Sequence, residues 1–335
     1  MKTYFATFIP GFSEEIQHTL KRDYADIQLL RLFASSILFK TNKQCKDVAS
    51  KPYLNNVFLV LNSFNVSKDK LNGSIVKKLY KDVDINRSLV EFAGKKTFRL
   101  IVKKGAELVH IPKEFTKKII NSITHQTNYI YSPLKADVEY WFLIRSEGFA
   151  VLGVKFLNFK RSYFHEIRQG QLQPEMANIM NLISEPNKLD LYLDPFAGHG
   201  ALPLDRAHFH PCKHIYASDN DKLLVNELRK FSGDKLTIQH ADASYLSYLK
   251  DHSINKIVTD PPWGIYKMQD IDYEIFYKKM LSEMLRVLKE HGLIVLLTAK
   301  TAEFENAMTQ FKVQLLKKYS TLVNGKKASV YKFTI

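Results

Sequence analysis

The sequence predicts an α/β fold in which a mostly parallel sheet forms the second half of the chain and a smaller α+β region precedes it. After about residue 190, short apolar runs alternate with segments of helical spacing, as expected of strands joined by helices. The first run, Leu191–Asp194, ends in an acid and leads into a turn with two glycines, Gly198 and Gly200. Three later runs also end at or near an acid. Several carboxylates are therefore expected at one edge of the sheet, where open α/β sheets bind ligands.

The composition fits a soluble globular protein, with 335 residues of which 45% are hydrophobic and 25% charged. No apolar run approaches the roughly 20 residues that a membrane helix needs, and the first residues lack the pattern of a signal peptide. The two cysteines, Cys45 and Cys212, are too few for a disulfide framework or a cysteine-rich zinc site. We expect a cytoplasmic monomer that uses no metal and binds no membrane.

The positive charge is concentrated in the first half. Residues 1–160 contain 26 Lys and Arg against 14 Asp and Glu, a net charge of +12, whereas the remaining residues carry only +3 of the total of +15. A basic surface attracts the phosphates of nucleic acids. The alternative is a soluble protein that simply has a high isoelectric point, and the charge alone does not decide between them.

The first half is expected to be an α+β region. Its opening order of strand, helix, strand and strand favours a ferredoxin-like fold over residues 1–55, with an irregular extension of the next domain as the alternative. Ser13 is the expected N-cap of the first helix, because Glu14 and Glu15 follow it in the first turn. Strands are expected at 2–9, 27–33, 36–40, 57–64, 97–105, 138–144 and 148–154, and further helices at 75–80 and 112–124.

The strand at 97–105, the helix after it and the segment 132–139 together resemble a THUMP domain, an RNA-binding module of several tRNA-modifying enzymes. The resemblance covers residues 56–155 and implies that this region binds tRNA, often at its acceptor end. Seven basic residues are then candidate phosphate contacts, and an ordinary solvated surface charge is the alternative for each. They are Lys95, Lys96, Arg99, Lys103, Lys104, Lys117 and Lys118.

Residues 156–185 are expected to be a linker with one helix, and residues 186–335 the mostly parallel domain. The linker's helix is predicted to begin at Pro174, since proline suits the first turn. A turn at Asn324 and Gly325 is expected to join the last two strands as an antiparallel pair. Strands are expected at 191–194, 215–219, 236–242, 254–259, 293–298, 313–322 and 328–335, with helices at 201–208, before 231, at 276–288 and at 302–311.

The spacing of the acids suggests a nucleoside ligand. Asp219 lies 25 residues after Asp194, and an acid at the end of the second strand of a βαβ unit commonly binds ribose hydroxyls. A dehydrogenase is the obvious alternative, because its fingerprint is also rich in glycine. However, the turn has no third glycine at the required spacing, and dinucleotide-binding folds do not call for the Asp260-Pro261-Pro262-Trp263 element after the fourth strand.

This order and spacing resemble the class I S-adenosylmethionine-dependent methyltransferases over residues 165–335. The resemblance implies a Rossmann-like, seven-stranded, mostly parallel sheet with S-adenosylmethionine as cofactor. It implies that Asp194 and the turn 196–200 hold the methionine end, Asp219 the ribose and Asp242 the adenine. His199 departs from the small residue usual in this turn. The implied cofactor-binding residues are Gln171, Leu172, Pro174, Asp194, Pro195, Phe196, Gly198, Gly200, Asp219, Asn220, Asp242 and Ala243.

The candidate catalytic residues are Asp260, Pro261, Pro262 and Trp263. An exocyclic amine on a base is a poor nucleophile, because its lone pair is delocalised into the ring. Hydrogen-bond acceptors at the Asp260 carboxylate and the Pro261 carbonyl can localise that lone pair, while Trp263 stacks on the extruded base. The alternative is a proline turn with a buried tryptophan.

Together the two resemblances imply an enzyme that forms N2-methylguanosine in tRNA, in the acceptor stem or at its junction with the D-arm. The same reaction on ribosomal RNA is the nearest alternative. A DNA adenine-N6 methyltransferase uses a similar tetrapeptide, but the basic first half argues against it. An RNA-binding protein that keeps the methyltransferase fold without activity is the alternative from another class.

Overall fold

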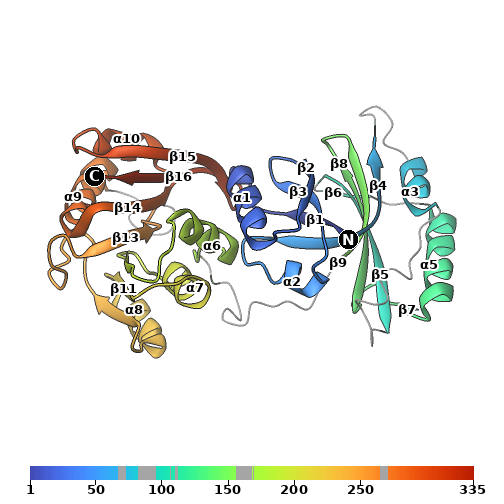
Figure 1. Ribbon diagram of the computed structural model, residues 1–335, viewed down its shortest axis with the longest axis horizontal. Coiled ribbons are helices and arrows are strands. Elements are labelled where there is room, and N and C mark those ends of the chain that lie inside the picture. The colour runs from blue at the N-terminus through green and yellow to red at the C-terminus, as the bar shows by residue number, and fades with distance from the viewer. Residues whose placement is uncertain are drawn as a thin grey trace. The chain divides into compact units, whose positions relative to one another are not determined.

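The computed structural model describes residues 1–66, 73–81, 96–105, 107–109, 112–155, 168, 170–264 and 271–335. The chain divides into two units (Figure 1). Unit 1 comprises residues 1–8 and 16–161, and unit 2 comprises residues 9–15 and 162–335. Within the described residues, no helix has the length and apolar character needed to span a membrane.

Unit 1 is built on one sheet with the strand order β2-β3-β1-β4-β9-β8-β5-β6, and β7 also pairs with β5. Its first four strands, in the order 2-3-1-4 with α1 and α2 between them, form the βαββαβ arrangement predicted as ferredoxin-like. The elements are β1 (Lys2–Thr7), α1 (Ser13–Asp23), β2 (Gln28–Leu32), β3 (Ser36–Thr41), α2 (Cys45–Ala49), β4 (Asn56–Asn65), α3 (Gly73–Tyr80), β5 (Thr97–Lys104), β6 (Glu107–Leu108), α5 (Lys113–Thr127), β7 (Ile130–Tyr131), β8 (Val138–Arg145) and β9 (Phe149–Lys155).

β4 joins the two predicted regions of the first half, although its residues fall only in the second. It pairs with β1 on one side and with β9 on the other, so the sheet runs without a break across the predicted border at residue 55. Helices α3 and α5 lie on one face of this sheet (Figure 1). Ile119 and Ile123 of α5 pack there against Phe98, Tyr140 and other alternate residues of β5, β8 and β9. Since side chains alternate along a strand, the intervening residues point to the opposite face.

Unit 2 contains a seven-stranded sheet with the order β12-β11-β10-β13-β14-β16-β15. The pairs from β12 to β14 are parallel, and β16 runs antiparallel to both of its neighbours, so the predicted seven-stranded, mostly parallel sheet is confirmed. The elements are α6 (Pro174–Ile183), β10 (Leu191–Asp194), α7 (Ala201–Phe209), β11 (His214–Asp219), α8 (Lys222–Leu228), β12 (Leu236–His240), β13 (Ile254–Thr259), α9 (Tyr273–Val287), β14 (Leu288–Thr298), α10 (Thr301–Met308), β15 (Gln314–Val323) and β16 (Lys326–Thr334).

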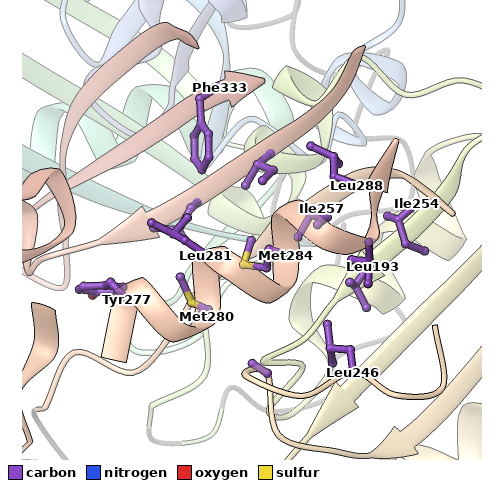
Figure 2. Packing of buried hydrophobic residues seen from close by; sticks show 14 of the residues in the cluster. Leu193, Leu246, Ile254, Ile257, Tyr277, Met280, Leu281, Met284, Leu288 and Phe333 are labelled. Carbon is purple, nitrogen blue, oxygen red and sulfur yellow. The ribbon is translucent and has the colours of Figure 1, made fainter. Parts of the chain in front are cut away.

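Helix α9 covers the centre of the unit 2 sheet. It begins three residues earlier than predicted, because Asp272 caps it by accepting a hydrogen bond from the Ile275 N–H at 3.0 Å. Figure 2 shows Met280, Leu281 and Met284 of this helix directed at the strands. Loss of such a buried side chain to alanine typically costs about 2–5 kcal/mol, so this packing fixes the strand ends that carry the acids.

The segment Ile9–Glu15 packs against β15 within unit 2, although it lies more than 300 residues away in sequence. Phe12 stacks on Tyr319 at 5.1 Å, and the Tyr319 hydroxyl donates to Glu15 at 2.8 Å. Gly11 has φ +96°, and a Cβ there would lie 2.2 Å from the Ser320 carbonyl oxygen. Only glycine permits this approach, so the turn predicted from Pro10 and Gly11 has a packing reason as well.

Candidate active site

A cavity of about 910 Å³ opens at the carboxyl ends of β10, β11, β12 and β13 in unit 2. The alternation of strands and helices brings the four predicted acids to this one edge of the sheet. Two predicted residues, Pro174 and Gly200, are not among the described residues that line it. The predicted residues that do are Gln171, Leu172, Asp194, Pro195, Phe196, Gly198, Asp219, Asn220, Asp242, Ala243, Asp260, Pro261, Pro262 and Trp263.

The two glycines of the turn after β10 have different reasons to be glycine. Gly198 lines the cavity with φ +52°, which is left-handed backbone. Gly200 has φ +86° and precedes α7, where an added Cβ would lie 2.5 Å from Leu228 Cδ2 and 3.0 Å from Leu204 Cδ1. Gly200 is therefore required by the packing of α7 on α8, while Gly198 leaves the backbone open toward the cavity.

Pro174 is the first residue of α6 and is buried, as the predicted helix start requires. The residues just before it do line the cavity: Gln171 is nearly buried and its side-chain oxygen accepts from the Arg168 N–H at 3.0 Å. Gln173 Nε2 donates to Asn324 Oδ1 at 2.9 Å. This bond ties the start of α6 to the turn between β15 and β16, where Asn324 and Gly325 have positive φ as expected of a hairpin.

Asp219, at the end of β11, shapes the cavity through both carboxylate oxygens. Its Oδ2 accepts a hydrogen bond from the Gly198 N–H at 2.8 Å, and its Oδ1 accepts from the Asp221 N–H at 2.9 Å. Asp219 thus links the glycine turn to the loop after its own strand. Each oxygen keeps a further lone pair for a ligand hydroxyl. Asp242, after β12, accepts from the Ser244 N–H at 2.7 Å through its Oδ1 and also lines the cavity.

Asp194 is a buried carboxyl at the centre of the sheet edge. Its Oδ1 accepts from the Thr259 hydroxyl at 2.8 Å and from the Phe196 N–H at 3.2 Å. Its Oδ2 is buried and has no hydrogen-bond partner among the described residues. Burial, with a smaller contribution from the Asp219 carboxylate, raises the pKa of Asp194 to about 7.

Asp260 follows β13 and lies close enough to Asp194 to interact electrostatically with it. Burial first, and then the Asp194 charge, raise the pKa of Asp260 to about 8. Asp260 Oδ1 and Trp263 Nε1 are both buried and lie near enough for the indole N–H to act against the raised pKa of Asp260, but neither makes a hydrogen bond of ordinary geometry with a described residue. Buried polar atoms are normally paired, so these orphaned atoms mark a place suited to a polar ligand.

The cavity has a second wall that the sequence alone did not identify. Helix α9 and the β15–β16 turn contribute Ile275, Phe276, Lys279, Asn324 and Lys326. The Phe276 ring lies 5.8 Å from that of Phe196. Lys279 and Lys326 are exposed and make no ion pair with any residue the structure describes. Their spacing along the chain carries no signal, because only the fold brings a helix start and a hairpin tip to the same cavity.

The predicted RNA contacts all belong to unit 1 and do not lie together. Lys95 lies outside the described residues. Lys96 and Lys104 are exposed at the two ends of β5, and Lys117 and Lys118 are exposed on α5. Arg99 differs from the expectation of a free cation. Its Nε donates to Glu139 at 2.6 Å, and the Glu139 side chain is only 1% exposed, so Arg99 mainly neutralises a buried acid.

A protein family described as a methyltransferase domain matches most of unit 2. The UPF0020 family, described as an RMKL-like methyltransferase domain, matches residues 161–329. The tRNA (guanine(10)-N2)-dimethyltransferase of Methanocaldococcus jannaschii is 27% identical over 153 residues, covering 43% of this chain and 42% of the relative. The human tRNA (guanine(6)-N(2))-methyltransferase THUMP3 is 29% identical over 180 residues, 48% of this chain and 35% of the relative. The matched part spans less than half of each relative.

Solved structures extend the likeness to the whole chain at the level of fold. TrmN from Thermus thermophilus superposes with a TM-score of 0.80 over 100% of this chain and 99% of that one, at 18% identity. SMU.472, a putative methyltransferase in complex with SAH, gives a TM-score of 0.71 over 99% of this chain and 98% of that one, at 15% identity. At such identities these matches speak for the fold alone, and they agree with the predicted fold class of both halves.

Proposed function

The chain belongs to the RMKL-like methyltransferase family, and on this basis we propose that it transfers a methyl group from S-adenosylmethionine to the exocyclic N2 of guanine in tRNA. The observation that carries the proposal is the juxtaposition of Asp260, with its orphaned buried oxygen, and Trp263 in the cavity that also holds Asp219 and Asp242. Both curated relatives are named as tRNA guanine-N2 enzymes, which favours guanine over adenine.

The residues present suit S-adenosylmethionine. Asp219 would accept hydrogen bonds from the ribose hydroxyls, and Asp242 with buried Ala243 would face the adenine. The buried Oδ2 of Asp194, lacking a described partner, suits the positive end of the methionine part. When bound, the cofactor supplies an electrophilic methyl group on a sulfonium. The cationic ligand would lower the raised pKa values of Asp194 and Asp260, so cofactor binding and ionisation of these acids would favour each other.

On the other side of the cavity, the Asp260 carboxylate and the Pro261 carbonyl would accept hydrogen bonds from the two hydrogens of the guanine amine. These bonds direct the nitrogen lone pair at the methyl carbon. Methylation of the nitrogen would make one amine proton strongly acidic, and the Asp260 carboxylate would accept it. Trp263 and Phe276 would hold the extruded base, so positioning provides much of the acceleration.

We expect the full chain, incubated with methyl-labelled S-adenosylmethionine and bulk tRNA, to form N2-methylguanosine detectable by mass spectrometry of the nucleosides. A methylated adenine as product would contradict the proposal. Methylation of ribosomal RNA but not of tRNA would establish the nearest alternative. Binding of both ligands without methyl transfer would instead point to an inactive RNA-binding protein. The basic first half, with its THUMP-like region, would supply the tRNA-binding surface. A cytoplasmic setting of the protein stays a prediction.

Lys279 and Lys326 are proposed to contact phosphates beside the extruded nucleotide, since they are the cations of the cavity's substrate side. We expect Lys279→Met and Lys326→Met each to raise the KM for tRNA about three- to tenfold. Each should also reduce the slope of log K against log salt by the amount expected for about one phosphate contact. The neighbours provide matched controls. Lys278 pairs with Glu274 at 2.6 Å, and neither Lys278 nor Lys327 is among the described residues of the cavity wall. Equal effects in both members of each pair would contradict the assignment.

A further inference from the structure

Unit 1 has an aromatic and basic site on the sheet face opposite α3 and α5. The alternate residues of β5, β8 and β9 that face away from these helices include Arg99, Lys103, Glu139, Trp141 and Lys155, which we call the Trp141 site. The register sets Arg99, Glu139 and Lys155 side by side across the three strands. Trp141 is half-buried, so one part of its ring reaches solvent.

The Trp141 ring is held in one orientation. Its Nε1 donates to Glu139 Oε2 at 2.8 Å, and Glu139 is in turn fixed by Arg99. Gly153 is the residue directly opposite Trp141 on β9, and an added Cβ there would lie 2.9 Å from the Phe58 Cβ. The missing side chain lets the indole meet the Phe58 ring edge-on at 5.6 Å. An aromatic ring fixed in this way loses little conformational entropy when a ligand stacks on it.

The sheet curls toward this face. Arg31 and Phe33, at the β2 edge, lie 4.9 and 5.9 Å from the Phe149 ring on β9. Three strands separate β2 from β9, and in a flat sheet with a strand spacing of about 4.8 Å these groups could not meet. A cluster of buried apolar residues, including Phe5, Phe58 and Phe149, fills the hollow, and Trp141 is a partly exposed member at its border.

Two lysines flank the ring. Lys103 Nζ lies 5.4 Å and Lys155 Nζ 5.2 Å from its centroid, within the range of cation–π attraction. Neither lysine makes an ion pair with a described residue. Burial lowers the pKa of Lys155, while Glu139 acts against this and Arg99 and Lys103 add to it. The Trp141 site thus combines three cations with a single acid, and that acid is already neutralised by Arg99.

We infer that the Trp141 site binds an unpaired nucleotide of the RNA substrate, with the base stacked on the indole and the adjacent phosphates held by Lys103 and Lys155. This inference rests on the proposed RNA substrate but concerns a site outside the methyl-transfer cavity. A fixed aromatic ring between flexible cations is the combination that binds single-stranded nucleic acid. As the base stacks, each lysine would move from the ring to a phosphate. Each would then lose its cation–π contact with Trp141 and gain an ion pair with the phosphate.

The chain contains only two tryptophans, which gives a direct test. In Trp263→Phe, Trp141 is the single indole fluorophore, and we expect bulk tRNA at low salt to quench its emission. Trp141→Ala should weaken tRNA binding about tenfold, whereas Trp141→Phe should stay within about threefold of the parent because either ring can stack. Unchanged S-adenosylmethionine affinity in both variants would establish that they are folded.

Charge is tested with two double variants of equal net change. Lys103→Met/Lys155→Met should reduce the slope of log K against log salt by about 1.4, as expected for two single-strand phosphate contacts, and by more than Lys117→Met/Lys118→Met on α5 does.

The inference is wrong if tRNA leaves Trp141 emission unchanged, if Trp141→Ala binds tRNA like the parent, or if polyglutamate quenches as strongly as tRNA. If the parent methylates tRNA and these variants bind tRNA as the parent does, only the assignment of the Trp141 site is wrong. A parent that binds no RNA would overturn the proposed function as well.

Discussion

Replacing Asp260 by alanine is expected to lower the single-turnover rate of methyl transfer about 100-fold or more, while the affinity for S-adenosylmethionine stays within about threefold. The two effects separate because Asp260 would contact the amine only when the base is in the cavity. Its Oδ1, buried and without a described partner, is available for that bond. The measurement is rapid-quench methyl transfer to tRNA, with cofactor affinity by calorimetry. An alanine variant as fast as the parent would remove Asp260 from the mechanism.

The same residue should give the reaction its pH dependence. Only the carboxylate form accepts both the hydrogen bond and the proton, and burial raises the pKa of Asp260 to about 8. The kcat/KM of the parent for S-adenosylmethionine, which reports ionisation of the cofactor-free enzyme, should therefore rise with pH up to about 8 and level off above. Asp260→Asn keeps one acceptor oxygen but cannot ionise. Its kcat/KM should therefore be lower than that of the parent and should no longer rise between about pH 7 and 8. The same raised pKa affects the stability of the fold in the opposite direction. It stabilises the folded state at low pH, and this contribution to the free energy of unfolding is lost as the pH rises through 8.

The parallel half of the fold followed from the sequence because its signals are local. Each strand from Leu191–Asp194 to Ile254–Thr259 is a short apolar run followed by an acid, and a parallel sheet brings such ends to one edge. The Asn324 and Gly325 turn was equally local, since their positive φ values are what these residues favour. The cavity's predicted wall is therefore almost entirely a set of strand-end residues.

What the sequence did not reveal depends on contacts between distant segments. Nothing near Lys279 or Lys326 indicates a cavity, because helix α9 and the last hairpin meet there only after folding. The sequence predicts Arg99 as a phosphate contact, because only the strand register shows that it lies opposite the buried Glu139. The sequence around Trp141 likewise gives no sign of a site, because the residues that flank its ring lie on neighbouring strands. The docking of Ile9–Glu15 on β15 joins residues at opposite ends of the chain, which no periodicity can indicate.

Replacing Asp219 by alanine is expected to weaken S-adenosylmethionine binding by at least tenfold, with tRNA affinity nearly unchanged. A hydrogen bond to a charged group contributes about 1.5–3 kcal/mol, and about 1.4 kcal/mol corresponds to a factor of ten. Asp219 would support cofactor binding in two ways. It would accept a hydrogen bond from the ribose, and it accepts the bond from the Gly198 N–H that holds the turn beside the cavity. The measurement is calorimetric titration of each variant with S-adenosylmethionine.

Asp221 is the matched control for this change. It lies two residues further on in the same loop, caps α8 by accepting from the Leu223 N–H at 2.9 Å, and is not among the described residues lining the cavity. Asp221→Ala should cost about 1 kcal/mol of stability yet leave cofactor affinity within about twofold. Equal losses of cofactor affinity in both variants would mean that only the conformation of the loop matters, and not a direct contact of the Asp219 carboxylate. A loss confined to Asp219→Ala, with Asp219→Asn intermediate because its amide keeps one acceptor, would tie the carboxylate itself to the ribose.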